Sequence, residues 1–404
     1  MELGRRELIT AFLGGAVAAS CKSTGGARKK VPGELVDRVV ETGHLLRGGP
    51  LPVASNVEAL DVLIIGAGAA GLSAAWRLAA AGVTSFKVIE VDAEAGGTAR
   101  SGANAVSAYP WGAHYLPAPL QDRGPVMKLL RELGAVTAVD DKGRPHFAEE
   151  MLVHEPDERL FYKGAWYEGL YLRAGASPRD LEELRRFEAQ MDAFGKARDG
   201  KGRKAFAVPL DTGSDDAEWT SLDKLSMAEW FSQQGYRSPR LKWMVDYACR
   251  DDYGAPSELI SAYAGIWYFA ARNEGQGDRS EGYLAWPEGN GRLIHHLRDA
   301  AGTGRIFTKL LAHTVIPDEQ GCTVHAFDAA AKTPVAYRAR HVVLAVPRFV
   351  AKHIVAPWRS TPPEFLSAFQ TTPWVVANLT LSSRPTSRGF PLCWDNVFYE
   401  SKSL

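Results

Sequence analysis

The hydrophobic pattern of the chain begins with a short apolar run at 62–65, Val-Leu-Ile-Ile, which is rich in β-branched residues and ends at a glycine. An apolar run without polar alternation predicts a buried parallel strand. The Ala/Leu-rich stretch 69–81 contains no proline and predicts a helix. A second apolar run at 86–89 predicts another strand, which ends on Glu90. Strand, helix and strand in this order predict an α/β unit with a parallel sheet.

Three glycines, Gly66, Gly68 and Gly71, lie between the first strand and the helix in the spacing G-x-G-x-x-G. Gly66 permits the tight turn, Gly68 lets a pyrophosphate approach the backbone, and Gly71 lets the helix pack closely on the strand. The N–H groups and the dipole at the start of the helix would face the phosphates. Glu90 follows Gly71 by 19 residues, close to the roughly 20 at which an acid meets a ribose hydroxyl. These features predict dinucleotide binding; the alternative is a glycine-rich turn in another α/β protein.

The pattern changes in the middle of the chain. The stretch 146–169 alternates and carries aromatic residues, which predicts strands of a second sheet, with a hairpin turn at Lys163-Gly164. The stretch 177–194 has helical spacing, and Ser177 followed by proline is typical of a helix N-terminus. Further helices are predicted at 126–134, 226–234, 239–251, 257–271 and 292–301. Further strands are predicted at 305–311, 322–327, 333–339, 341–347, 375–380 and 396–399.

The composition bounds the class of protein. The length of 404 residues suggests two to three domains, and 47 basic side chains balance 47 acidic ones. Because there is no net charge to attract polyanions, nucleic acid is not an expected partner. Cys249, Cys322 and Cys393 form no C-x-x-C pair, which predicts inert thiols rather than a disulfide framework or a zinc site. No metal site is predicted.

The first 21 residues resemble an export signal. Arg5-Arg6 precede an apolar, small-residue run at 8–20 that is too short to span a bilayer, and adjacent arginines are typical of the twin-arginine route. The run ends in Ala-Ala-Ser-Cys, which resembles a lipoprotein cleavage box with Cys21 as the lipidated residue. The expected location is the bacterial periplasm or, through a lipid anchor, its membrane. The alternatives are a signal cleaved without lipid and a cytoplasmic protein whose signal is not used.

A second glycine pair follows the acidic residue, in the run Gly96-Gly97-Thr98-Ala99-Arg100-Ser101. This run resembles the GG-R-x-x-[ST] motif of the flavin-containing amine oxidase superfamily, which includes phytoene-desaturase-like enzymes and uses the motif to wrap the FAD pyrophosphate. Thr98 stands where the family usually has arginine, and Arg100 is the candidate to supply that charge. The family's next landmark, a Gly-Ala pair beside the flavin ring, corresponds to Gly112-Ala113.

The resemblance implies FAD as the cofactor and an α/β fold. It implies a Rossmann-like FAD-binding domain, with a parallel sheet and a β-meander crossover, and a mixed α+β substrate domain with a helical insert. The implied parts are the signal (1–21), a tether and lead-in (22–60), the FAD-binding domain (61–118 and 285–350) and the substrate domain (119–284 and 351–404). Motif and resemblance together predict these cofactor-binding residues: Gly66, Ala67, Gly68, Ala69, Ala70, Gly71, Glu90, Val91, Gly96, Gly97, Thr98, Arg100, Gly112, Ala113 and Ala312.

Three departures from the family pattern bear on chemistry. Amine oxidases usually carry a lysine on the strand corresponding to 375–380, where this sequence offers only Ala377 or Asn378, and L-amino acid oxidases have arginine at the place of Tyr115. His114 is a candidate acid–base group; the alternative is a histidine that only hydrogen-bonds within its loop. The catalytic candidates are therefore His114, Tyr115 and Asn378. Family members also close with a further flavin-binding segment that this sequence lacks, so weak FAD binding is expected.

The expected function is hydride removal from a C–N or C–C bond of a small or apolar substrate to FAD. One alternative is a desaturase or isomerase that acts on a lipid-like substrate. Another is a catalytically silent, truncated flavin-fold lipoprotein. The substrate, the electron acceptor and the oligomeric state stay open at this stage.

Overall fold

The computed structural model describes residues 32–36, 39–153, 157–271 and 282–401. The predicted signal with Cys21 lies outside these ranges. The chain divides into two compact units, 1–40 and 41–404, and the sheets and the site lie in the second. A short helix, α2 (Val40–His44), precedes the first strand. None of the helices in the described ranges is long and apolar enough to cross a membrane.

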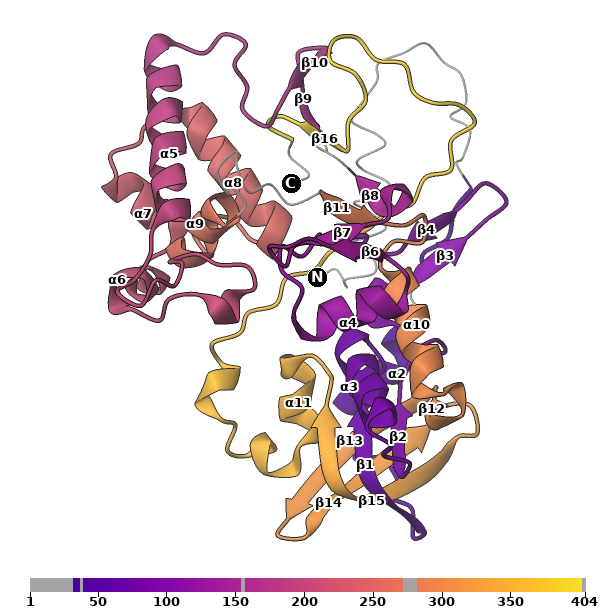
Figure 1. Ribbon diagram of the computed structural model, residues 1–404. Helices are drawn as coiled ribbons and strands as arrows, with labels where there is room; N and C mark the ends of the chain where they lie inside the picture. The colour runs from indigo at the N-terminus through magenta and orange to yellow at the C-terminus, as the bar shows by residue number, and fades with distance from the viewer. Residues whose placement is uncertain (1–31, 37–38, 154–156, 272–281, 402–404) are drawn as a thin grey trace, which may run out of the picture. The chain divides into compact units, whose positions relative to one another are not determined.

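A six-stranded sheet forms the core of the second unit, in the order β12-β2-β1-β15-β14-β13 (Figure 1). Its first four strands are parallel neighbours, and the last three form an antiparallel meander. The strands are β1 (Val57–Ile65), β2 (Phe86–Ile89), β12 (Ile306–Phe307), β13 (Leu310–Asp318), β14 (Gly321–Asp328) and β15 (Thr333–Leu344). The predicted parallel sheet with a β-meander is therefore confirmed.

Helices cover both faces of the parallel strands. On one face, Val62 and Ile64 of β1 pack with residues of α3 (Ala69–Ala80) and α10 (Gly291–Ala301). On the other face, Leu63 and Ile65 pack with residues of the meander and with Ile354 of α11 (Arg348–Ile354). Burial on both faces explains why β1 reads as a continuous apolar run instead of an alternating one.

Two strand predictions in this sheet were wrong. The stretches 333–339 and 341–344 belong to one strand, β15, which pairs with β14 over 333–339 and with β1 from 336 to 344. No glycine or proline separates the two stretches, so nothing breaks the strand. The predicted strand 305–311 is instead divided at Lys309, which has a left-handed φ of 62°. There the backbone N–H of Leu310 donates to the Glu90 carbonyl oxygen at 2.8 Å.

The helices of the middle of the chain surround an aromatic core. Ser177 caps α5 (Pro178–Lys196) in a capping box with Asp180, as the sequence predicts. Helix α9 begins at Ala262, later than predicted, because the Ser261 side chain caps it by accepting from Ala264 N–H. Buried aromatic residues from these helices, among them Phe187, Trp230 and Phe231, pack together with Tyr236 from a connecting loop. The other helices are α4 (Gly124–Glu132), α6 (Ala217–Thr220), α7 (Met227–Gln233), α8 (Pro239–Tyr253) and α9 (Ala262–Ala270).

Small sheets complete the unit. The predicted hairpin is present as β9 (Glu158–Tyr162) and β10 (Ala165–Glu168), with φ of 45° at Lys163 and 85° at Gly164. Both residues have positive φ, as a tight hairpin turn requires. The other short strands are β3 (Ser101–Ala103), β4 (Ala108–Pro110), β5 (Tyr115–Pro117), β6 (Val136–Val139), β7 (Pro145–Phe147), β8 (Leu152–Val153), β11 (Tyr283–Ala285) and β16 (Asp395–Phe398).

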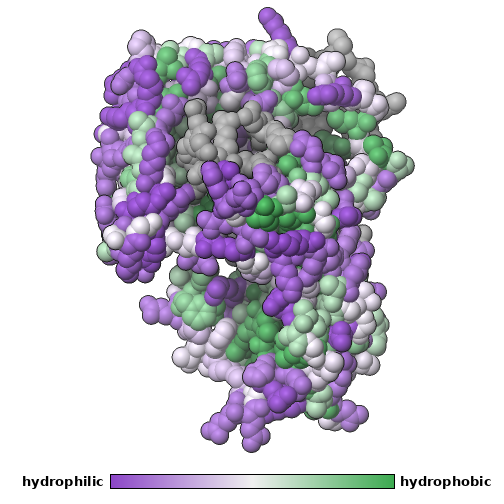
Figure 2. Space-filling view, in the orientation of Figure 1, coloured by the Kyte–Doolittle hydropathy of each residue, from purple (hydrophilic) through white to green (hydrophobic). Residues whose placement is uncertain are grey.

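The predicted strand 375–380 is not formed. This stretch pairs with no strand of the described chain, and its side chains, Asn378 included, are exposed. Trp374, Val375 and Leu379 are each more than half exposed. The face of the molecule drawn in Figure 2 shows apolar residues at the surface among polar ones. The apolar composition favours a strand, but a strand forms only where a neighbour supplies ladder partners.

A histidine pair, the buried His313 and the half-buried His325, lies in the antiparallel half of the sheet. The ring of His313 on β13 is stacked with that of His325 on β14, with centroids 6.2 Å apart. The Arg359 guanidinium donates to the His313 carbonyl oxygen at 2.7 Å. Burial lowers the pKa of His313 below its ordinary value of 6.5, and the charges of His325 and Arg359 lower it further, against a backbone contact with Pro52 that raises it.

We expect the free energy of unfolding to fall as the pH drops below about 6.5, because the unfolded chain then binds a proton that folded His313 disfavours. Relative to His313→Gln, the parent should lose up to about 1 kcal/mol between about pH 7 and about pH 5.5. Urea unfolding at both pH values measures this difference. His295→Gln, at an exposed position on α10, is the control. Equal pH dependence of the parent and His313→Gln would contradict the prediction.

Candidate functional site

The turn between β1 and α3 is as tight as the glycine spacing predicts. Gly66 has φ of 102°, and a Cβ there would lie 2.4 Å from the Ala345 carbonyl oxygen. A Cβ at Gly71 would lie 1.8 Å from the Gly66 carbonyl oxygen. Only glycine at both positions lets α3 start this close to the carboxyl end of the sheet, where ligands of such folds bind.

Gly68 and Gly97 face each other in front of the start of α3. A Cβ on Gly97 would come within 3.2 Å of the Gly68 Cα, and a Cβ on Gly68 within 3.9 Å of the Gly97 Cα. The neighbouring Gly96 donates its N–H to the Ala67 carbonyl oxygen at 2.7 Å, which fixes the second glycine pair against the first motif. Gly68 is the N-cap of α3 and provides no side-chain cap for its first N–H groups. We call Gly66–Gly71 together with Gly96–Gly97 the glycine cradle; its bare backbone and helix N-terminus fit a pyrophosphate.

Glu90 links the first glycine motif to the loop that leads to the second glycine pair. Its Oε2 accepts from the Ala67 N–H at 2.6 Å, and its Oε1 accepts from the Asp92 N–H at 2.9 Å. A carboxylate has about four lone-pair sites, so both oxygens can still accept from a hydroxyl. The half-buried Val91 lies between these contacts. The start of β13 is also nearby, because Leu310 donates to the Glu90 carbonyl, while Ala312 is buried further along that strand.

Arg100 is engaged within its own loop. Its guanidinium forms an ion pair with the buried Asp92 at 2.5 Å, and its Nε donates to the Gly97 carbonyl oxygen at 3.2 Å. Thr98, at the family's arginine position, is exposed. The positive charge of Arg100 therefore braces the loop that carries Gly96 and Gly97.

The Gly112-Ala113 pair is held between two segments. The Ala113 N–H donates to the Thr98 carbonyl oxygen at 3.2 Å, and a Cβ on Gly112 would lie 2.5 Å from that same oxygen. On the other side, the Asn290 N–H donates to the Ala113 carbonyl oxygen at 3.1 Å. The structure thus brings this pair beside Thr98, the residue that follows the second glycine pair.

An aromatic cluster follows the pair. The His114 ring is stacked on Trp394 with centroids 5.7 Å apart, and Tyr115 meets Tyr283 edge-on at 4.9 Å. The His114 Nδ1 lies 3.3 Å from the Gly112 carbonyl oxygen, within its own loop, and the side chain is exposed. Tyr283 and Trp394 were not predicted from the sequence, because they lie far from His114 in the chain and share no motif with it.

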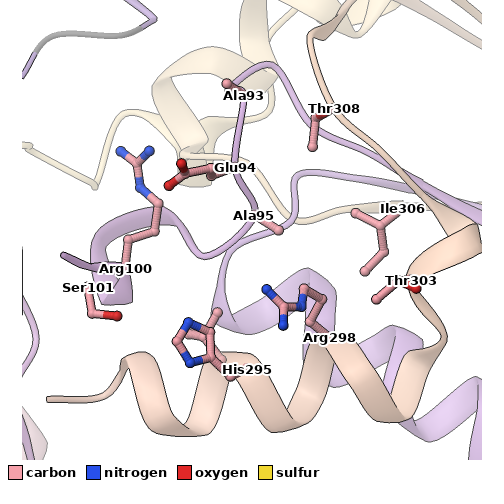
Figure 3. Close-up of a pocket in the computed structure, with 11 residues that line it drawn as sticks. Ala93, Glu94, Ala95, Arg100, Ser101, His295, Arg298, Thr303, Ile306 and Thr308 are labelled. Atoms are coloured by element: carbon pink, nitrogen blue, oxygen red, sulfur yellow. The ribbon is translucent and has the colours of Figure 1, made fainter. Parts of the chain in front are cut away.

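A polar pocket of about 430 Å³ opens beside the glycine cradle (Figure 3). Of the predicted cofactor-binding residues, Arg100 lines this pocket and none of the glycines does. The side chains of Arg100, His295 and Arg298 surround the hollow, with Glu94 beside Arg100. The remaining lining residues are Ala93, Ala95, Ser101, Ile294, Thr303, Ile306 and Thr308.

Three carboxylates also gather away from the cradle. Oxygens of Asp199, Asp215 and Asp216 lie within 4.8 Å of one another. Arg203 pairs with Asp199 at 2.7 Å and also with Asp215. Because Arg203 already pairs with two of the three carboxylates, we assign no metal to these residues.

The parallel sheet, the glycine cradle and the acid at the end of β2 define an α/β fold of the dinucleotide-binding class. The chain belongs to the flavin containing amine oxidoreductase family, whose model matches residues 69–385. Its cofactor is accordingly FAD.

Solved structures share the fold. Putrescine oxidase bound to putrescine is 19% identical, with a TM-score of 0.54 over 75% of this chain and 61% of that one. Cyclohexylamine oxidase from Brevibacterium oxydans is 18% identical, with a TM-score of 0.51 over 74% of this chain and 60% of that one. The chain thus spans about three fifths of the length of these structures. No match was found among curated proteins.

Proposed function

We propose that this protein removes a hydride from a C–N bond of an amine, or from a C–C bond of another small or apolar substrate, and passes it to FAD. The observation that carries the proposal is the glycine cradle, in a chain that belongs to a flavin-dependent family. FAD supplies the hydride-accepting ring when bound. The protein supplies binding and orientation.

The residues of the site have distinct roles in this proposal. The N–H groups at the start of α3, beside Gly68 and Gly97, would hold the pyrophosphate. Glu90 would accept from a ribose hydroxyl with its remaining lone pairs. The Asp92–Arg100 pair keeps the second glycine motif in place.

The aromatic cluster supports the choice of substrate class. His114, Tyr115, Tyr283 and Trp394 present ring faces and edges next to the Gly112-Ala113 pair. Such rings bind apolar groups and attract an ammonium group through their π faces. A desaturase or isomerase of a lipid-like substrate is the second candidate, because the described stretch 375–380 offers no lysine for the role seen in amine oxidases.

The test is a titration of the purified protein with FAD, followed by anaerobic addition of substrates. We expect the flavin absorbance bands to shift and the shift to saturate during the titration, and the bands to be lost on addition of a primary amine. Bleaching by a polyene or polyunsaturated fatty acid, with none by amines, would favour the second candidate. Absence of bound flavin together with tight binding of NADH would refute both.

A further inference from the structure

Asn290 precedes α10, yet its side chain does not cap that helix. Its Nδ2 donates instead to the Tyr115 carbonyl oxygen at 3.0 Å, while its backbone N–H donates to the Ala113 carbonyl oxygen. Asparagine is a favoured capping residue, so the diversion of its amide needs another reason. The two bonds hold the stretch 112–115 against the start of α10.

The glycines on either side of Asn290 let its turn pack closely on the neighbouring segments. Gly289 has φ of 58°, and a Cβ there would lie 2.7 Å from the Pro110 Cβ. A Cβ on Gly291 would lie 2.5 Å from the Ser101 Oγ. The backbone at Asn290 is therefore fixed against the segments that carry the second glycine motif and the Gly112-Ala113 pair.

The oxygen of the Asn290 carboxamide accepts no hydrogen bond from the described residues. The Oδ1 of Asn290 is buried and has no hydrogen-bond donor among the residues that the structure describes. Because Nδ2 is committed to the Tyr115 carbonyl, the amide cannot flip to relieve this oxygen without placing two acceptors together. Unpaired buried acceptors are rare and costly in folded proteins, so this oxygen is expected to meet a donor from a bound group.

We propose that Asn290 is a cofactor-positioning residue. Its Oδ1 accepts a hydrogen bond from a hydroxyl or N–H of the ribityl–flavin portion of FAD, while its Nδ2 holds the stretch 112–115. The inference rests on the proposed function. The flavin end of FAD is chosen because Asn290 bonds to both sides of His114, directly after the Gly112-Ala113 pair.

The test compares Asn290→Leu, which removes both polar ends, with Asn290→Asp, which keeps an oxygen acceptor but loses the amide donor. Asn396→Leu is the matched control, because the Asn396 Oδ1 accepts from the Arg159 Nε at 2.5 Å and its Nδ2 donates to the Cys393 carbonyl at 2.8 Å. Three quantities are measured for each variant: the Kd for FAD by flavin fluorescence, the visible bands of the bound flavin, and the melting temperature of the FAD-free protein.

We expect Asn290→Leu to raise the Kd about tenfold and to shift the flavin bands. Asn290→Asp should bind FAD more tightly than Asn290→Leu. If Asn290 only held the stretch 112–115 in place, the two variants would have equal Kd values for FAD. Asn396→Leu should lower the melting temperature while keeping the parental Kd and bands. Parental Kd and bands in Asn290→Leu, or an equal loss of affinity in Asn396→Leu, would overturn the proposal. A parent protein that binds no FAD would overturn the proposed function as well, so the two failures are distinct.

Discussion

Replacing Gly68 with valine is expected to weaken FAD binding at least a hundredfold, about 2.7 kcal/mol, while leaving the fold intact. The backbone at Gly68 is extended, with φ of −77° and ψ of −172°, which any residue adopts. The closest heavy atom to an added Cβ is the Gly97 Cα at 3.9 Å, so the protein itself has room for it. The methyl groups of valine would then fill the glycine cradle where the pyrophosphate is expected.

Two measurements separate the loss of binding from a loss of folding. Titration with FAD gives the affinity, and thermal unfolding of the FAD-free protein should show only the small cost of a poorer N-cap, about 1 kcal/mol. Gly200→Val is the control, because a Cβ at Gly200 meets nothing within 4 Å. If Gly68→Val bound FAD like the parent, the glycine cradle would not be the cofactor site.

Replacing Gly71 with alanine is expected to lower the free energy of unfolding by about 3 kcal/mol or more, the upper end of the usual cost of overpacking. The added Cβ would lie 1.8 Å from the Gly66 carbonyl oxygen and 3.0 Å from its carbonyl carbon. These are backbone atoms, so relief requires α3 to move away from the end of β1. The gain of about 1 kcal/mol in helix propensity does not offset that movement.

Gly265→Ala in α9 is the matched control for this change. An added Cβ at Gly265 also meets an obstacle, at 2.7 Å, but the obstacle is the flexible side chain of Met227. A methionine side chain can change rotamer, so this variant should lose clearly less stability than Gly71→Ala. Urea unfolding monitored by circular dichroism measures both. Equal losses of stability in the two variants would show that the contact of α3 with the Gly66 turn does not cause the destabilisation.

Most local elements could be predicted because their causes are local. The apolar run of β1, the cap of α5 at Ser177 and the hairpin turn at Lys163-Gly164 each depend on neighbouring residues. The roles of the glycines in the first motif could also be predicted, because their spacing indicates where the backbone needs a left-handed φ or a close approach by another group. Gly66 and Gly71 meet those requirements in the structure.

Pairing between distant segments could not be predicted in the same way. The stretch 375–380 has the composition of a strand, yet it finds no partner strand among the described residues, while β15 pairs with β14 on one side and with β1 on the other. Whether a stretch becomes a strand depends on which N–H and C=O groups lie beside it in space. The sequence pattern around one stretch does not contain that information.

The sequence by itself determined the parallel α/β core, the glycine motif with Glu90 and the family to which the chain belongs. These features depend on the periodicity of hydrophobic residues, on tight turns and on the spacing of motif residues, and each of these is set by a few neighbouring residues. Only the tertiary structure decided that Arg100 pairs with Asp92, that Trp394 and Tyr283 join His114 and Tyr115, and that Asn290 holds Ala113. Those contacts join segments separated by up to hundreds of residues, and they exist because the packing of helices and sheets, rather than local propensity, brings their polar and aromatic groups within reach.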